Sequence, residues 1–122
     1  MGQCMSTWVT RLDGDLLEAC VRDVQQCLHD TLVLLCDTQH LPRCPQLRHE
    51  VLEALSPEDG WTEHDYLYSP DRITSSGAWA ELANGHAAEI TGFLKQGTLV
   101  GYSVERSLDN AYVHVRMRTK PL

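Results

Sequence analysis

Two groups of side chains have the residue types that acid–base chemistry needs. The run 63–65 reads Glu-His-Asp, and His86 stands three residues before Glu89. A carboxylate next to a histidine fixes the tautomer of the imidazole and raises its basicity, so such a pair can act as a general base. The chain has six histidines and seventeen acidic residues, so adjacent pairs also arise by chance and then form surface salt bridges. The catalytic candidates are Glu63, His64, Asp65 and His86, and the first three are favoured because aromatic residues surround them.

A second group has the side chains that bind zinc. Two cysteines and two histidines lie close together after position 35. Their spacings lack the pair of cysteines separated by two residues that is usual in zinc fingers, and the first cysteine belongs to an apolar helix face. We therefore expect no metal and no other cofactor. The residues of this group are Cys36, His40, Cys44 and His49.

The composition is that of one globular domain spanning 1–122. Hydrophobic residues make up 43% of the chain and charged residues 22%, which is near the average for folded proteins. The net charge of −7 argues against nucleic acids and anionic membranes as partners, because both repel an acidic body. It suits a protein that meets a basic surface. The sequence contains no P-loop, nucleophile elbow, dinucleotide-binding glycine pattern or HExxH motif.

The five cysteines are an odd number for a disulfide framework. Several fall on an apolar helix face, where thiols behave as small hydrophobes. We therefore expect a reducing, cytoplasmic location, and no secretory leader opens the chain. The first residues match the N-myristoylation pattern, with Gly2 as acceptor and Cys4 as a second acylation site. Because no polybasic stretch follows, we expect neither acylation of Gly2 nor attachment to a membrane.

The longest regular pattern spans 15–36. Apolar residues recur there at steps of three and four, which places them on one side of an α-helix. Asp15 followed by Glu18 is typical of a capping box. The last turn, 32–35, is apolar on all sides, so we expect this end to lie deepest in the core. The residues predicted to form the buried face are Leu17, Cys20, Val21, Val24, Cys27, Leu28, Leu32, Leu35 and Cys36.

A second helix should follow and pack antiparallel against the first. Pro45 suits the first turn of a helix, where its missing N–H costs nothing. Apolar residues then repeat at helical spacing as far as Leu55, and Pro57 ends the pattern.

Residues 78–96 can be read in two ways. As a helix they carry one apolar face, and Gly97 is well placed to cap the end. Against a helix stand Gly85 and Gly92, which each cost about 1 kcal/mol relative to alanine in a helix interior, and Asn84-Gly85 is also a strong hairpin signal. We favour the helix because helical matches outnumber alternating ones.

The C-terminal part predicts a β-hairpin of strands 99–106 and 111–118. In the second strand, Ala111, Val113, Val115 and Met117 alternate with polar residues, so they should face the core. The opposite face should meet solvent or a partner; it carries Tyr112, His114, Arg116 and Arg118. Residues 56–77 show no regular pattern beyond a short strand at 66–68. The predicted fold is therefore α+β, with two antiparallel N-terminal helices, a third helix at 78–96 and an antiparallel hairpin that joins a small sheet.

The functional hypothesis is a small acidic interaction protein, such as an inhibitor or immunity-type neutraliser of a basic protein surface. The irregular segment around 58–71 is both acidic and aromatic. Carboxylates there would steer the encounter, and aromatic side chains would anchor the complex. The predicted binding residues are Glu58, Asp59, Trp61, Tyr66, Tyr68 and Asp71.

Two other hypotheses remain open. One is a small α+β ligand-binding protein or enzyme with a pocket of histidines and carboxylates, reached past His64, His86 and His114; this version needs 78–94 to form strands. The other is a homodimer formed through the exposed edge of the hairpin or through Trp8, since small sheets often complete themselves by pairing.

Overall fold

A computed structural model describes residues 16–41, 60–76 and 79–122 of the chain. Within these ranges the fold is α+β, as predicted, with three helices and a three-stranded antiparallel sheet. The helices are α1 (Leu16–Thr38), α3 (Pro70–Ser76) and α4 (Trp79–Gln96). The strands are β1 (Thr62–Tyr68), β2 (Leu99–Arg106) and β3 (Val113–Thr119).

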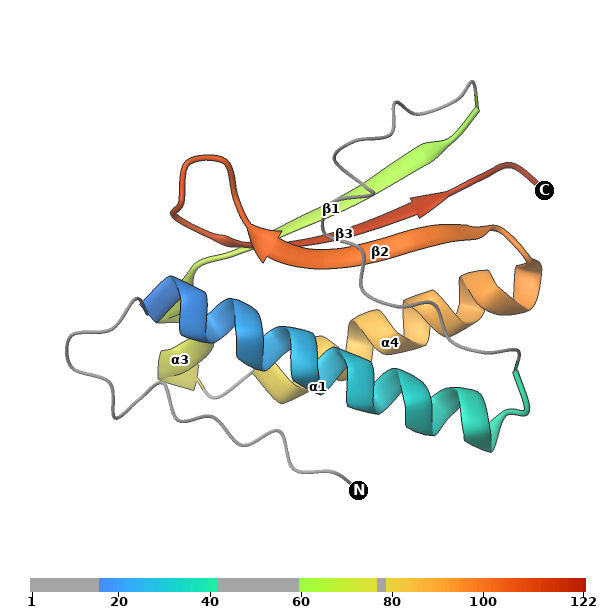
Figure 1. Cartoon of the computed structure of the whole chain (residues 1–122), viewed down its shortest axis with the longest axis horizontal. Coiled ribbons are helices and arrows are strands. Elements are labelled where there is room, and N and C mark those ends of the chain that lie inside the picture. The colour runs from blue at the N-terminus through green and yellow to red at the C-terminus, as the bar shows by residue number, and fades with distance from the viewer. Residues whose placement is uncertain (1–15, 42–59, 77–78) are drawn as a thin grey trace.

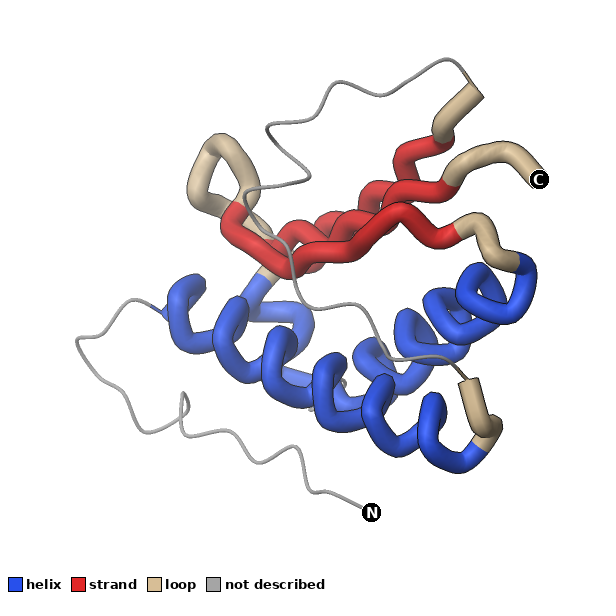
Figure 2. Tube along the Cα trace, turned by 45° about the vertical axis from the view of Figure 1, so that its right-hand side comes forward, coloured by secondary structure: helices blue, strands red, loops and turns tan. Residues whose placement is uncertain are grey.

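The sheet forms one layer, and α1 and α4 form a second layer over one of its faces (Figure 1, Figure 2). The strand order is β1-β3-β2, so β3 is central and the other two strands are edges. β2 and β3 form the predicted C-terminal hairpin, and β1 extends it on the far side of β3. Because side chains alternate along a strand, each strand presents one set to the helices and the other set to the opposite face.

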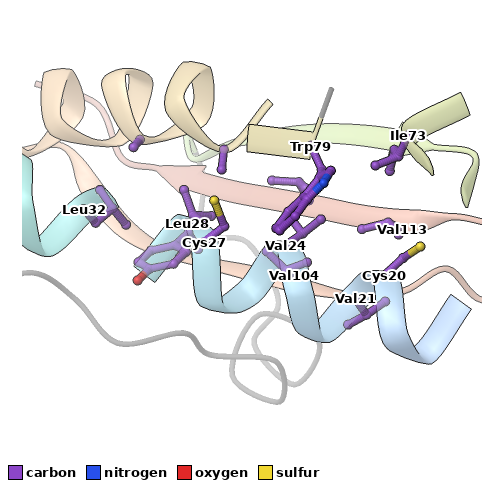
Figure 3. Close-up of a cluster of buried hydrophobic side chains, with 14 of the residues drawn as sticks. Cys20, Val21, Val24, Cys27, Leu28, Leu32, Ile73, Trp79, Val104 and Val113 are labelled. Carbon is purple, nitrogen blue, oxygen red and sulfur yellow. The ribbon is translucent and has the colours of Figure 1, made fainter. Parts of the chain in front are cut away.

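The hydrophobic core lies between these two layers (Figure 3). Val113, Val115 and Met117 of β3 are fully buried, as the alternation predicted. Ala111, which was predicted on the same face, instead precedes the strand and is exposed. Helix α1 covers them with the face that the apolar periodicity predicted, although Leu35 is only partly buried. The buried residues of α1 are Leu17, Ala19, Cys20, Val21, Val24, Cys27, Leu28, Leu32 and Cys36.

The last turns of α1 differ from the expectation that this end lies deepest. Leu32 is fully buried, but Val33 is 41% exposed and Leu34 is 46% exposed. At 100° per residue a helix cannot turn four consecutive side chains toward one layer, so the apolar run continues around to the outer side.

Helix α1 ends in a Schellman motif in which His40 has a left-handed backbone, with φ of 54°. The amide of Leu41 donates to the carbonyl of Cys36 at 2.9 Å, and the amide of His40 donates to the carbonyl of Asp37 at 3.3 Å. Glycine usually occupies this position because it has no Cβ. A histidine there carries a steric cost.

Residues 79–96 form the helix that we favoured over a hairpin. Neither Gly85 nor Gly92 has a neighbour within 4 Å of where a Cβ would lie, so these glycines meet no close contact that requires them. Gly97 ends the helix as predicted, with φ of 73°. The amides of Gly97 and Thr98 donate to the carbonyls of Leu94 and Phe93, at 3.1 and 3.0 Å.

The segment that showed no regular pattern is more ordered than predicted. The short strand expected at 66–68 is confirmed but begins at Thr62. Ser75 and Ser76, expected in a loop, end α3. The predicted second helix at 45–55 lies outside the described residues.

The expectation that the cysteines of the first helix are reduced thiols is correct only for Cys20, which is free and buried. Cys27 and Cys36 each form a disulfide. These two positions are nine residues apart on one helix, about 13 Å along its axis, which is too far for a bond between them. The cysteines of α1 therefore do not support the expected reducing, cytoplasmic location.

Candidate functional site

A connected group of polar side chains lies between β1 and α4. The alternation of β1 places Tyr66 and Tyr68 on the helix-facing side, opposite Val115 and Val113 of β3. Helix α4 presents His86 and Glu89, one turn apart, to the same place. We call these four residues the His86 cluster: Tyr66, Tyr68, His86 and Glu89.

Three hydrogen bonds of 2.7 Å join the four side chains of the His86 cluster. Nδ1 of His86 contacts Oε1 of Glu89, and Nε2 of His86 contacts the hydroxyl of Tyr68. The hydroxyl of Tyr66 donates to Oε2 of Glu89. The ring of Tyr66 also lies 4.6 Å from the ring of His86, centroid to centroid. Both nitrogens of the imidazole and both oxygens of the carboxylate are therefore satisfied.

These contacts fix the direction of each hydrogen bond when His86 is neutral. The ionised Glu89 can only accept, so Nδ1 of His86 carries the proton. Nε2 then accepts from the hydroxyl of Tyr68. A carboxylate, an imidazole and a phenol are thus arranged in series, which is the geometry of a histidine general base held by an acid.

The two tyrosines of the His86 cluster hold their protons more strongly than usual. The hydrogen bond to Glu89, burial and the neighbouring negative charge raise the pKa of Tyr66 to about 12. Burial and the charge of Glu89 raise the pKa of Tyr68, while the charge of Arg72 on α3 lowers it in part.

The opposite face of the sheet carries a network of charges. Glu63 pairs with Arg118 through Oε1, and this arginine is only 1% exposed. Burial of a guanidinium is tolerated because a carboxylate compensates its charge. The prediction that this face of β3 meets solvent or a partner is therefore wrong for Arg118.

Arg116 lies at the centre of this network. It contacts Glu105 at 3.1 Å, Asp65 at 3.4 Å and Glu63 at 3.6 Å. Burial alone would lower the pKa of Arg116. The bond to Glu105 and the charges of the three carboxylates outweigh burial, so the pKa of Arg116 is raised. His114 contacts Asp65 at 3.1 Å. Opposite charges on neighbouring strands thus hold the two edges of the sheet to β3.

A surface pocket of about 420 Å³ opens where the hairpin turns. Its two arginines are already bound by carboxylates, Arg106 by Glu18 at 2.7 Å and Arg116 by the network above. Of the three histidines expected to line a ligand cavity, His114 alone is among the lining residues described. These are Glu105, Arg106, Leu108, His114 and Arg116.

The catalytic candidates at 63–65 do not form one site, because β1 separates them. Glu63 and Asp65 point to the charged face of the sheet, where they bind arginines. His64 points to the helices, 3.1 Å from the hydroxyl of Thr119 and beside the ring of Phe93. His86 is instead combined with Glu89, the pair that the sequence also offered.

The predicted binding residues are dispersed. Tyr66 and Tyr68 are directed into the His86 cluster, and their hydroxyls are bound within the chain. Trp61 is half-buried, and Asp71 at the start of α3 is exposed. Glu58 and Asp59 lie outside the described residues.

The structure does not support Cys36 as a zinc ligand. Cys36 forms a disulfide, so it offers no thiolate to a metal. His40 is exposed at the end of α1, and Cys44 and His49 lie outside the described residues. Among the residues that the structure describes, no three histidine, cysteine or acidic side chains gather as metal ligands.

The outer face of α1 is the second candidate site, and periodicity alone did not reveal it. Val33 and Leu34 are exposed between Asp30 and Asp37, at the spacing i, i+3, i+4 and i+7 that defines one helix face. The run 32–35 has four consecutive apolar residues, which is more than one buried helix face can hold. Comparing the two would have indicated that part of the run stays exposed. The outer face of α1 comprises Arg22, Gln26, Asp30, Val33, Leu34 and Asp37.

Comparisons of the chain with models of known protein families, with curated proteins and with solved structures gave no match. In the described part of the chain, no helix is long and apolar enough to cross a membrane.

Proposed function

We propose that this protein is an acidic interaction module that docks the outer face of α1 onto a protein partner with a basic surface. The observation that carries the proposal is the exposure of Val33 and Leu34 between two aspartates on one helix face. Such a face resembles the amphipathic helices that lie in apolar grooves of their partners.

The apolar pair supplies the anchor of this docking face. Two adjacent aliphatic side chains, each more than 40% exposed, leave apolar area in water that a partner can cover at about 25 cal/mol per Å². Anchors of this kind contribute most of the affinity when polar residues surround them. Val33 and Leu34 have Asp30 on one side and Asp37 on the other.

The charge at the end of α1 defines the chemistry of the partner. The last turn of α1 carries no basic residue, and Asp37 adds a negative charge to the negative end of the helix dipole. That arrangement costs about 0.3–1 kcal/mol in the free protein. A lysine or arginine from a partner would relieve it, so the face favours a basic surface with an apolar pocket.

The rest of the charge distribution agrees with this choice. Arg106, Arg116 and Arg118 are bound by carboxylates of the same chain, so their charges attract anionic partners only weakly. The net charge of the whole chain is −7, which would steer a cationic partner toward the protein and make association depend on salt.

Site-specific photo-crosslinking tests the proposal. A photoreactive amino acid replaces Leu34 in one protein, and Leu108, a 98% exposed residue beyond β2, in a matched control. In extracts of the source cells, position 34 should crosslink to a protein with a basic surface and position 108 should not. No product at position 34, the same product at both positions, or a product consisting of two copies of this chain would overturn the proposal.

Binding to the purified crosslinked protein then gives the energetics. The double substitution Val33→Ser and Leu34→Ser should weaken binding at least tenfold, or about 1.4 kcal/mol, whereas Leu108→Ser should leave it unchanged. The pair Asp30→Asn and Asp37→Asn should reduce the dependence of affinity on salt. Equal affinity of the Val33 and Leu34 variant would contradict docking through this face.

A further inference from the structure

The hydroxyl of Tyr68 is one end of the hydrogen-bonded series in the His86 cluster, and the carboxylate of Glu89 is the other. His86 is only 5% exposed, whereas Tyr68 at the end of β1 is partly exposed and the side chain of Glu89 is 37% exposed. The base is therefore shielded from water and lies between a hydroxyl and a carboxylate. This is the order in which a carboxylate-held base activates a nucleophile.

We propose that Tyr68 is a nucleophile toward small neutral acyl esters, with His86 as its general base and Glu89 as the positioning residue. The proposal rests on two distances of 2.7 Å, from the Tyr68 hydroxyl to Nε2 of His86 and from Nδ1 of His86 to Glu89. It uses no residue of the outer face of α1 and does not depend on the docking proposal.

Glu89 determines which nitrogen of His86 accepts a hydrogen bond. Because Oε1 of Glu89 binds Nδ1, the neutral imidazole presents its lone pair at Nε2, toward Tyr68. The second oxygen of Glu89 is held by the hydroxyl of Tyr66, so the carboxylate is fixed at both ends. A fixed base needs no rearrangement when the reaction begins.

The covalent step transfers one acyl group and one proton. The oxygen of Tyr68 forms a bond to the ester carbonyl carbon as its proton moves to Nε2 of His86. The tetrahedral intermediate then breaks its bond to the leaving alkoxide or phenoxide, which takes the proton back from Nε2. The products are O-acyl-Tyr68 and a free alcohol or phenol, and no oxidant or further reactant is needed.

The charges near Tyr68 favour an acyl ester over a phosphate ester. Glu89 bears a negative charge close to Tyr68 and the whole chain carries −7, so a phosphate dianion would be repelled. A neutral ester avoids this repulsion.

Reaction with p-nitrophenyl acetate tests the proposal on the intact protein. Release of p-nitrophenolate gives the rate, and fragment mass spectra of the digested protein locate the acetyl group. Tyr68 should be acetylated at least ~10-fold faster than Tyr112, a 38% exposed tyrosine beside β3, since general bases contribute 10²-fold or more. Acetylation of Tyr68 no faster than that of Tyr112 would overturn the proposal without the need for any variant.

Variants separate the base from a structural role. Tyr68→Phe should abolish the fast release, and Tyr112→Phe should leave it unchanged. His86→Asn, checked for folding by circular dichroism, should slow acetylation of Tyr68 at least ~10-fold. The wild-type rate should also fall in deuterium oxide, because a proton moves in the slow step. An unchanged rate in a folded His86→Asn protein, or the absence of a solvent isotope effect, would contradict the assignment of His86 as the base.

Discussion

The hydroxyl oxygen of Tyr68 lies 2.7 Å from Nε2 of His86, and this contact joins the end of β1 to α4. The two residues are 18 positions apart, and α3 lies between them in the sequence. Among the strands that the structure describes, β1 lies at one edge of the sheet and pairs with β3. The His86 cluster therefore attaches this edge to the helix layer as well as ordering a potential base.

Removing the hydroxyl of Tyr68 should destabilise the fold. Tyr68→Phe leaves Nε2 of the buried His86 without its donor, and an unsatisfied buried polar group costs about 1–3 kcal/mol. Urea unfolding of the variant should show this loss of free energy. Tyr112→Phe, at an exposed position, should change stability by less than about 0.5 kcal/mol. Equal effects of the two substitutions would contradict the network.

Breaking the buried ion pair on the other face should cost more. Glu63→Gln removes a carboxylate that binds Arg118, which is 1% exposed, and breaking a buried pair costs about 3–5 kcal/mol. The side chain of Glu63 is itself 23% exposed, so we expect a loss near the lower end of this range. Asp65→Asn is the matched control, because the side chain of Asp65 is 48% exposed and exposed pairs contribute about 1 kcal/mol or less. The two variants should differ clearly in urea midpoint, and similar midpoints would argue against a buried pair.

A glycine at the end of α1 should stabilise the protein. His40 has a left-handed backbone, where an L-residue costs about 1–2 kcal/mol, and part of the gain is lost because glycine is freer in the unfolded chain. His40→Gly should therefore raise the free energy of unfolding by about 0.5–1 kcal/mol. The reverse change at α4, Gly97→Ala, should lower it, since Gly97 has φ of 73°. Thermal unfolding of both variants checks the sign.

The disulfides of α1 should be visible in a count of thiols. Cys27 and Cys36 are each bonded, whereas Cys20 is free. Titration with a thiol reagent in denaturant should therefore give fewer thiols before reduction than the five of the fully reduced chain. Five thiols before reduction would contradict the bonds at Cys27 and Cys36.

In the native state the free thiol of Cys20 should be inert. Burial, and then the charges of Asp23 and Asp71, raise the pKa of Cys20 to about 11, and the thiolate is the reactive form. Alkylation at pH 8 should therefore require unfolding. Reducing the disulfides should lower stability by about 2–4 kcal/mol for each bond, which a urea titration with reductant measures.

Stability should decline at alkaline pH. The pKa values of Tyr66 and Tyr102 rise from 10.0 to about 12 on folding, because a carboxylate contact and burial respectively favour the protonated phenol. The folded protein then binds more protons than the unfolded chain, so the contribution of these two phenols to the free energy of unfolding is constant below pH 10 and falls from there toward pH 12. Tyr66→Phe should make this decline shallower, and an unchanged slope would contradict the assignment.

The sequence by itself was sufficient for the elements whose patterns are long. The three-and-four spacing of 15–36 predicted α1, and the alternation of Val113, Val115 and Met117 predicted β3 and its buried face. Even the ambiguous stretch at 78–96 was settled correctly by counting helical matches, because two glycines cost less than a buried helical face contributes.

Only the tertiary structure decided which polar residues meet. The run 63–65 looked like one acid–base group, but a strand sends neighbouring side chains to opposite faces, so Glu63 binds Arg118 while His64 faces the helices. The partner of His86 at Nε2, Tyr68, comes from another element. Likewise the apolar run at 32–35 is too long for one buried helix face, but only the packing of α1 decided that Val33 and Leu34 stay exposed. Local spacing fixes which residues share a face of one element, whereas the packing of layers determines which faces meet and which remain open to a partner.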